Sequence, residues 1–263
     1  MSTALRDALF RASPDRVVRA SHPLRSRSLA VAGGLVVSIG AAAMLVAAGC
    51  TAFRARPLYR GMARLTALMV LRVYGIRLHT HAPSRLLPGQ VVFISNHTSS
   101  LDLFVLVALG LPRCRFFLSG FLRRLIPLGV IAWLLGTFFT VPQDQPQERT
   151  RIFQRAERVL RATGESVYVS PEGGRVTTGS PGHFNRGAFH LALNLGAPIV
   201  PFHIRIPPAV DPGLGFDARP GTVDVVFLPA IETRGWSLKT LEQHIAAARN
   251  VLVRAHEEWS CPS

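Results

Sequence analysis

The pattern of apolar and polar positions divides the chain into two regions. Residues 28–53 form an uncharged apolar run that is long enough to cross a bilayer as a helix, which takes about 20 residues. From Gly89 onward, short apolar runs typical of buried strands alternate with longer stretches of helical spacing. This alternation predicts an α/β fold: a mixed, largely parallel sheet flanked by helices, with an N-terminal membrane-inserted helix.

The same pattern locates the individual elements. We expect strands over residues 91–94, 114–118, 137–141, 166–170, 197–204 and 222–228. We expect helices over residues 101–109, 147–162, 187–195 and 237–258, and a helical region that runs through Leu135. Residues 1–27 form an Arg-rich arm. Residues 54–80 mix Arg with apolar residues, which predicts a helical segment at the lipid headgroups or, alternatively, an ordinary surface helix.

The apolar run at residues 28–53 has alternatives to a single transmembrane helix. A re-entrant hairpin fits as well, because Arg residues flank the run on both sides and the positive-inside rule selects no orientation. A cleaved signal peptide is disfavoured, because the preceding arm is long and contains two Asp. Lipoprotein processing at Cys50 is a further alternative, since residues 47–50 roughly resemble a lipobox.

Composition narrows the classes of partner. The chain has a formal net charge of +15 and 48% hydrophobic residues, so we expect it to associate with anionic lipid or acidic carrier proteins. Nucleic acid is disfavoured, because the Arg-rich segments are poor in aromatic residues and contain no nucleic-acid-binding motif. The three Cys have no metal or redox spacing, and their odd number argues against a disulfide framework.

The first candidate site is the polar loop after the predicted strand at residues 91–94. His97 and Asp102 are five positions apart, so they meet only if His97 lies in the loop and Asp102 in the first turn of the next helix. Ser99 or Ser100 is then the predicted N-cap. A neutral His oriented by a carboxylate can take the proton of a substrate hydroxyl, so an alcohol can attack an acyl carbonyl without a Ser or Cys nucleophile.

The second candidate site is the loop after the predicted strand at residues 166–170. Its sequence, Pro171-Glu172-Gly173-Gly174-Arg175, combines a carboxylate, two glycines that let a ligand approach the backbone, and a guanidinium suited to bidentate phosphate binding. This combination predicts a cradle for a phosphate or an oxyanion. A plain turn is the alternative.

Four motifs in this order resemble those of the glycerolipid acyltransferase family, typified by bacterial lysophosphatidic acid acyltransferase. They are Asn96-His97-x4-Asp102, Pro171-Glu172-Gly173-Gly174-Arg175, Phe184-Asn185-Arg186-Gly187 and Ala197-Pro198-Ile199-Val200-Pro201. The resemblance covers residues 86–228. It implies an acyltransferase domain at residues 81–263 that moves a fatty acyl group from acyl-coenzyme A or acyl-carrier protein to the hydroxyl of a lysolipid. The implied acceptor is 1-acylglycerol-3-phosphate, which becomes phosphatidic acid, and the implied location is the cytoplasmic face of the inner membrane.

The resemblance also implies a role for each site residue. His97 is the implied general base and Asp102 its orienting carboxylate. The implied substrate-binding residues are Asn96, Glu172, Gly173, Gly174 and Arg175. Backbone N–H groups near Gly173, or at the start of the helix after Ser100, are candidates to stabilise the tetrahedral oxyanion. We expect no metal and no cofactor beyond the acyl donor.

The sequence departs from the family pattern where an acceptor phosphate binds. Ser119 and Pro142 occupy positions at which the family carries cations. Arg123, Arg124 and Arg186 are candidates to compensate. A lysophospholipid or aminolipid with another headgroup therefore stays an alternative acceptor.

Other classes of protein fit the sequence less well. A serine hydrolase requires a Gly-x-Ser-x-Gly elbow, which is absent from the sequence. A metallohydrolase would draw on ligands that are scattered along the chain, namely His97, Asp102, His183, His190 and His203. The one closely spaced pair with a recognised spacing is His79-x-His81. The alternative outside enzymes is a non-catalytic, membrane-anchored lipid-binding protein with the same fold.

Overall fold

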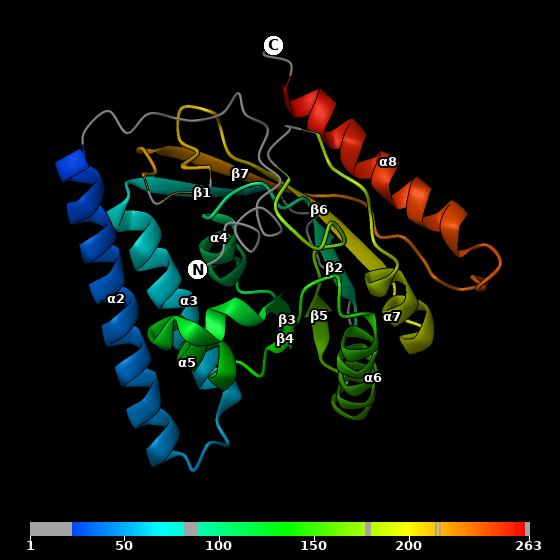
Figure 1. Cartoon of the computed structure of the whole chain (residues 1–263), viewed down its shortest axis with the longest axis horizontal. Helices are drawn as coiled ribbons and strands as arrows, with labels where there is room; N and C mark the ends of the chain where they lie inside the picture. The colour runs from blue at the N-terminus through cyan, green and yellow to red at the C-terminus, as the bar shows by residue number, and fades with distance from the viewer. Residues whose placement is uncertain (1–22, 82–88, 177–179, 214, 216, 261–263) are drawn as a thin grey trace.

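The chain folds around one seven-stranded sheet with the strand order β1-β7-β6-β2-β5-β3-β4 (Figure 1). The structure is a computed structural model that describes residues 23–81, 89–176, 180–213, 215 and 217–260. Neighbouring strands are parallel except β6 and β7, which are antiparallel, so the predicted mixed, largely parallel sheet is confirmed. The strands are β1 (Ile76–His81), β2 (Val92–Ser95), β3 (Cys114–Ser119), β4 (Phe138–Thr140), β5 (Ser166–Tyr168), β6 (Ile199–Arg205) and β7 (Gly221–Phe227).

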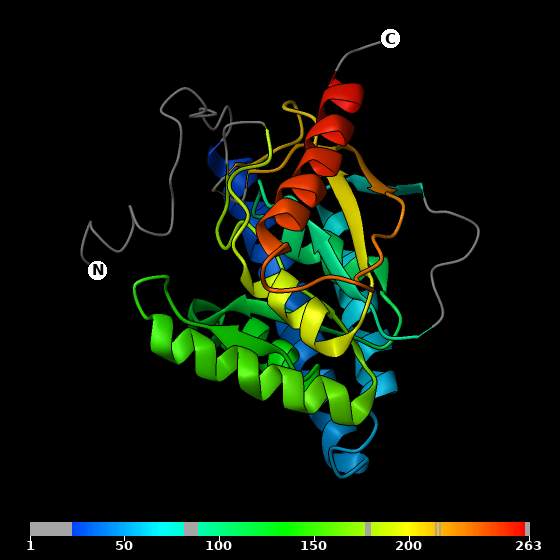
Figure 2. The same cartoon turned by 90° about the vertical axis from the view of Figure 1, so that its right-hand side faces the viewer.

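Helices cover both faces of this sheet (Figures 1 and 2). Helices α2 to α5 share one hydrophobic cluster with the sheet, and α6 to α8 share the other. Strand β2 shows how the sequence builds both clusters, because Phe93 points into the first and its neighbours Val92 and Ile94 into the second. The helices are α2 (Pro23–Cys50), α3 (Arg56–Val73), α4 (Asp102–Leu109), η2 (Gly120–Arg124, a 3-10 helix), α5 (Ile126–Leu134), α6 (Pro146–Thr163), α7 (Gly187–Leu195) and α8 (Leu241–Ser260).

The predicted helical segment at residues 54–80 is wrong at its C-terminal end. Helix α3 stops at Val73, and Gly75 reverses the chain with a φ of +70°. Residues 76–81 then form β1, which pairs in parallel with β7. The strand was missed because it lies at the sheet edge, where its polar side chains are exposed and the buried apolar run typical of a central strand is lacking.

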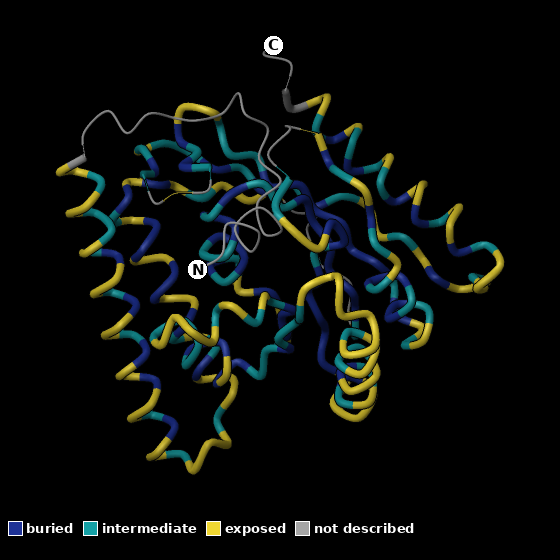
Figure 3. The backbone as a smooth tube through the Cα atoms, in the orientation of Figure 1, coloured by how far each residue is buried: buried dark blue, intermediate teal, exposed yellow. Residues whose placement is uncertain are grey.

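Helix α2 is continuous from Pro23 to Cys50, and residues 24–50 are long and apolar enough to cross a membrane by length and composition. No hairpin interrupts it. One face packs on α3 through Val37, Ala41 and Met44, whereas the opposite face exposes large apolar side chains, among them Ile39 (Figure 3). The helix includes the last residues of the predicted N-terminal arm, and residues 1–22 of that arm lie outside the described residues.

Candidate active site

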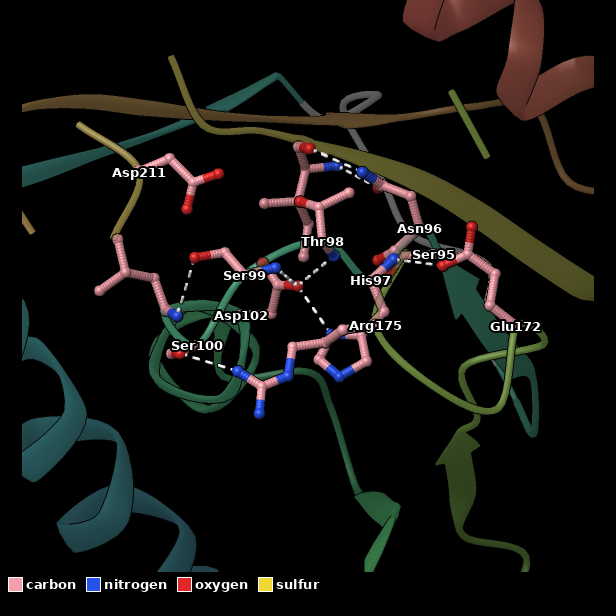
Figure 4. Close-up of polar contacts among 12 residues, drawn as sticks. Ser95, Asn96, His97, Thr98, Ser99, Ser100, Asp102, Glu172, Arg175 and Asp211 are labelled. Carbon is pink, nitrogen blue, oxygen red and sulfur yellow. Dashed lines mark hydrogen bonds and ion pairs between the residues drawn. The ribbon is translucent and has the colours of Figure 1, made fainter. Parts of the chain in front are cut away.

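His97 and Asp102 meet at the C-terminal end of the central strand β2. Nδ1 of His97 lies 2.7 Å from Oδ2 of Asp102 (Figure 4). His97 lies in the loop and Asp102 is the first residue of α4, as the five-residue spacing predicted. Because β2 is a central strand whose residues are all buried, its packing fixes the position at which the His97 loop leaves the carboxyl end of the strand.

The surroundings of Asp102 set which nitrogen of His97 can accept a proton. Asp102 is fully buried, and its Oδ2 also accepts hydrogen bonds from the backbone N–H groups of Thr98, at 2.8 Å, and Ser99, at 3.0 Å. Since Oδ2 acts as an acceptor in all of these contacts, Nδ1 of His97 carries the hydrogen and donates it in a hydrogen bond to Oδ2. The lone pair therefore lies on Nε2 of an imidazole whose side chain is 28% exposed.

The predicted N-cap at Ser99 or Ser100 is wrong. Helix α4 begins at Asp102, and Leu101 precedes it without a side-chain cap. The hydroxyl groups of both serines make other hydrogen bonds. Oγ of Ser99 accepts from the N–H of Leu101, and Oγ of Ser100 donates to the carbonyl of Gly213.

Glu172 supports the His97 loop from the second motif. Its Oε2 accepts the backbone N–H of His97 at 2.7 Å, and its Oε1 accepts the N–H of Gly182 at 2.8 Å. Burial raises the pKa of Glu172 to about 7, whereas the two N–H donors lower it. The carboxylate is only 6% exposed, so this geometry supports a positioning role in place of the substrate contact that the resemblance implied.

The side chain of Asn96 binds the neighbouring strand β6. Its Oδ1 accepts the N–H of Ile204 and its Nδ2 donates to the carbonyl of the same residue, at 2.8 and 2.9 Å. The side-chain amide thus continues the pairing of β2 with β6 beyond Ser95. Since both ends of this buried amide bind β6, Asn96 fixes the start of the catalytic loop.

The Gly-Gly-Arg part of the second motif faces the loop of His97. Gly173 has a φ of +67°, and a Cβ there would lie 2.8 Å from Nε2 of Gln143, so the turn requires glycine. A Cβ at the exposed Gly174 would meet open space. Nη1 of Arg175 donates to Oγ of Ser100 at 2.8 Å (Figure 4). The guanidinium therefore lies beside the His97 loop, at the residue three positions after His97.

Several backbone N–H groups around the predicted oxyanion positions bind acceptors within the protein. The N–H groups of Thr98 and Ser99 bind Asp102, and that of Ser100 binds the carbonyl of Gly213. The N–H of Gly173 lies 3.3 Å from the carbonyl of Ser170. These hydrogen bonds hold the loop and the start of α4 together, and the guanidinium of Arg175 lies beside them through its contact with Ser100.

Two of the three cations considered as compensation are engaged elsewhere. The guanidinium of Arg123 lies over the ring of Phe139, and Arg186 forms an ion pair with Glu242. Arg124 is exposed on η2. At the two departures from the family pattern, Oγ of Ser119 accepts the N–H of Phe121 at the start of η2, and Pro142 is exposed after β4.

The remaining histidines do not assemble into a metal centre. Within the described ranges, no group of three or more His, Cys, Asp or Glu side chains is placed to hold a metal ion. His79 and His81 lie beside Asp224 at the sheet edge. His203 is buried on β6 against the ring of His256, and burial lowers its pKa to about 4.

An apolar cavity lies beside the first turn of α4, on the face of the sheet covered by α2 to α5. Leu103 and Phe104, which directly follow Asp102, contribute to its lining. Phe116 and Leu118 of β3 and Ile131 of α5 extend it. The site thus combines an imidazole, a buried carboxylate, a guanidinium and an adjacent apolar space.

These groups lie together at the carboxyl end of the central strand β2 in a mostly parallel α/β sheet. A family model described as Acyltransferase matches residues 76–205, and the chain belongs to this family. The match contains both candidate motifs and strands β1 to β6.

Curated relatives and a solved structure agree with this membership. The chain is 34% identical to 1-acyl-sn-glycerol-3-phosphate acyltransferase alpha of Homo sapiens, over 52% of this chain and 49% of the relative. It is 29% identical to the 1-acyl-sn-glycerol-3-phosphate acyltransferase of Pseudomonas aeruginosa, over 70% of this chain and 71% of the relative. The chain spans about half the length of the mammalian relatives it matches.

The fold is that of a solved family member. The crystal structure of the 1-acyl-sn-glycerophosphate acyltransferase PlsC from Thermotoga maritima superimposes with a TM-score of 0.68. The superposition covers 88% of this chain and 97% of that one, at 17% sequence identity. This similarity confirms the architecture, including the placement of helices on both faces of the sheet.

Proposed function

We propose that the chain transfers a fatty acyl group from an acyl thioester, acyl-coenzyme A or acyl-carrier protein, to the hydroxyl of a lysolipid. The observation that carries this proposal is the contact between Nδ1 of His97 and the buried carboxylate of Asp102, which leaves Nε2 as an exposed base. In the Ser-His-Asp triad a carboxylate likewise orients a histidine base. In the proposed reaction, the hydroxyl of the substrate takes the place of the serine of that triad.

The reaction balances with these groups. Nε2 of His97 removes the hydroxyl proton of the lysolipid as its oxygen forms a bond to the thioester carbonyl carbon. The resulting oxyanion lies near Arg175, whose guanidinium is the proposed electrostatic partner. Collapse of the tetrahedral intermediate breaks the carbon–sulfur bond, and the leaving thiolate takes the proton from the imidazolium of His97.

The proposed acceptor is 1-acylglycerol-3-phosphate, so that the product is phosphatidic acid of phospholipid biosynthesis. The human and Pseudomonas relatives are 1-acyl-sn-glycerol-3-phosphate acyltransferases, which supports this acceptor, as does a guanidinium beside the base. Gly173 and Gly174 would let the headgroup approach the backbone near Arg175. Ser119 and Pro142 in place of cations keep another lysophospholipid or an aminolipid as the second candidate.

The proposed location is the inner membrane, with the catalytic domain facing the cytoplasm. The exposed apolar face of α2 supports membrane association. Exposed apolar side chains on α5, Ile126 at 74% and Trp133 at 58%, support a site that opens towards lipid. Leu103 and Phe104, which follow Asp102 in α4, line the small apolar cavity, and the fatty acyl chain is proposed to lie against this side of α4.

The test is an acyl-transfer assay with the purified full chain, a panel of lysolipids and both classes of donor. We expect transfer by the wild type and its loss in His97→Ala. The matched control is His79→Ala, because this histidine is 62% exposed on the edge strand β1. Activity that survives His97→Ala contradicts the general-base assignment. No transfer by the wild type to any acceptor favours the non-catalytic lipid-binding protein.

A further inference from the structure

Helix α8 lies outside the segment that matches the family model, yet it contacts the support of the catalytic loop. Leu241, Ile245 and Leu252 bury its inner face in the cluster shared with α6 and α7. Figure 2 shows α8 beside the segment that leads into α7. Arg249 is half-buried and turns towards this segment at residues 181–182.

The guanidinium of Arg249 binds two consecutive carbonyl groups. Its Nη2 donates to the carbonyl of Pro181 at 2.8 Å and its Nε to that of Gly182 at 2.6 Å. The carbonyl of Pro181 and the N–H of Gly182 belong to one peptide group. That N–H donates to Oε1 of Glu172 at 2.8 Å, so a cation and a carboxylate bind opposite ends of the same peptide group.

We propose that Arg249 is a positioning residue for His97. Its guanidinium acts through the peptide group of Pro181 and Gly182 to hold Glu172, whose other oxygen binds the backbone N–H of His97 at 2.7 Å. The catalytic loop would thus be secured by a helix about 150 residues away in the sequence. The functional consequence rests on the acyl transfer proposed above.

Two physical features make this connection specific. Hydrogen bonds in series polarise one another, so a cation at the carbonyl strengthens donation by the N–H to Glu172. The planar guanidinium of Arg249 reaches both carbonyls, which a lysine with a single ammonium cannot do in the same way. The segment also packs closely, because a Cβ on Gly182 would lie 2.8 Å from Cγ2 of Val176.

Val176 also binds the backbone of His97. Its N–H donates to the carbonyl of His97 at 2.8 Å, while Glu172 binds the N–H of the same residue. The titratable groups that act on Glu172 are His97 and Asp102 of the catalytic loop. The peptide group of Pro181 and Gly182 also acts on it, through the N–H of Gly182. With the pKa of Glu172 at about 7, a weaker donor at Oε1 shifts this carboxyl towards its neutral form at neutral pH.

The experiment compares Arg249→Ala and Arg249→Lys with the wild type in the acyl-transfer assay from about pH 6 to about pH 9. The matched control is Arg254→Ala, which removes an exposed arginine from the same helix. We expect kcat of Arg249→Ala to fall about tenfold at pH 7, with KM for the acyl donor unchanged. We expect the acid limb of its pH profile to move up by about one unit, Arg249→Lys to lie between, and Arg254→Ala to match the wild type.

A second readout does not depend on turnover. Hydrogen exchange at the backbone N–H groups of His97 and Gly182 is expected to be faster in Arg249→Ala than in Arg254→Ala. An unchanged pH profile together with unchanged exchange at both N–H groups overturns the proposal. Equal loss of activity in both Arg249 variants, at an unshifted pH profile, also overturns it, because it reports only destabilisation. If the wild type transfers no acyl group, the proposed function fails and the exchange rates alone decide the role of Arg249.

Discussion

Replacing Asp102 by Asn tests whether a buried negative charge supports His97 when it takes a proton. In the wild type, Oδ2 of Asp102 accepts from His97, Thr98 and Ser99, and Oδ1 is buried without a hydrogen-bond partner in the described structure. The Asn oxygen can take the place of Oδ2 and keep all three donors. The NH2 group then occupies the site of Oδ1, where it finds no acceptor.

The expected losses follow from these contacts. The contact between Asp102 and His97 keeps its geometry but loses its charge, which matters most when His97 becomes an imidazolium. We expect kcat to fall about 10²–10³-fold, or about 3–4 kcal/mol in activation free energy. The buried NH2 group lowers the free energy of unfolding by about 1–3 kcal/mol. The loss of activity therefore exceeds what a destabilised but folded protein would show.

The assay measures thiol release and acylated product by the purified full chain at saturating donor and acceptor. Denaturant unfolding of the same samples gives the free energy of unfolding. Asp224→Asn is the control, since this carboxylate interacts with histidines at the far edge of the sheet. In a His97→Ala background, Asp102→Asn is expected to cause little further loss, because the two residues act as a unit. Wild-type kcat in Asp102→Asn would refute the reasoning.

Three further predictions follow from other parts of the structure. Burial raises the pKa of Glu172 from 4.5 to about 7, so the folded state binds a proton that the unfolded state has lost. The contribution of Glu172 to stability therefore falls by about 3 kcal/mol as pH rises from about 4.5 to about 7, and Glu172→Gln removes this slope in denaturant unfolding measured across that range. Arg175→Lys keeps the charge but loses the planar fork, so we expect KM for a phosphate-bearing lysolipid to rise about tenfold and KM for a neutral lysolipid to change little; equal changes would remove Arg175 from the headgroup site. Ile39→Arg places a charge on the exposed apolar face of α2 at about 3 kcal/mol, so vesicle flotation is expected to weaken, whereas the similarly exposed Leu238→Arg leaves flotation unchanged; equal flotation of both would argue against insertion of this face.

The sequence predicted the core of the site because its signals are local. Strand β2 is a short apolar run buried on both faces, and the polar loop and apolar helix after it are unambiguous. The spacing of His97 and Asp102 then required one in the loop and the other in the first turn, which the structure confirms. The Gly173 turn also followed from sequence, because its positive φ favours glycine.

The rest depends on contacts between distant segments. Sequence shows that Asn96 and Glu172 are polar, but not that their side chains bind the backbone of Ile204, His97 and Gly182 instead of a ligand. Strand β1 lacks a buried apolar run because it lies at the edge of the sheet, so it could be found only through its pairing with β7.

The contacts of Arg249 could not be predicted from the sequence for the same reason. It lies on α8, far along the sequence from either motif, and only the folded chain brings it to Pro181 and Gly182. The N-cap shows that local rules also compete. Ser99 and Ser100 favour that position by residue type, but their hydroxyl groups bind the N–H of Leu101 and the carbonyl of Gly213 instead.

The central claim is that Nε2 of His97 takes the proton from the acceptor hydroxyl in a direct transfer. Its most direct test is the single-turnover rate of acyl transfer by the wild type and by His97→Asn, with bound donor and saturating lysolipid. The account predicts a rate at least about 10²-fold lower in His97→Asn with donor binding intact, and no acyl group covalently attached to the wild-type chain. Transfer at the wild-type rate by His97→Asn, or an acyl-enzyme that forms and decays at the rate of turnover, would contradict it.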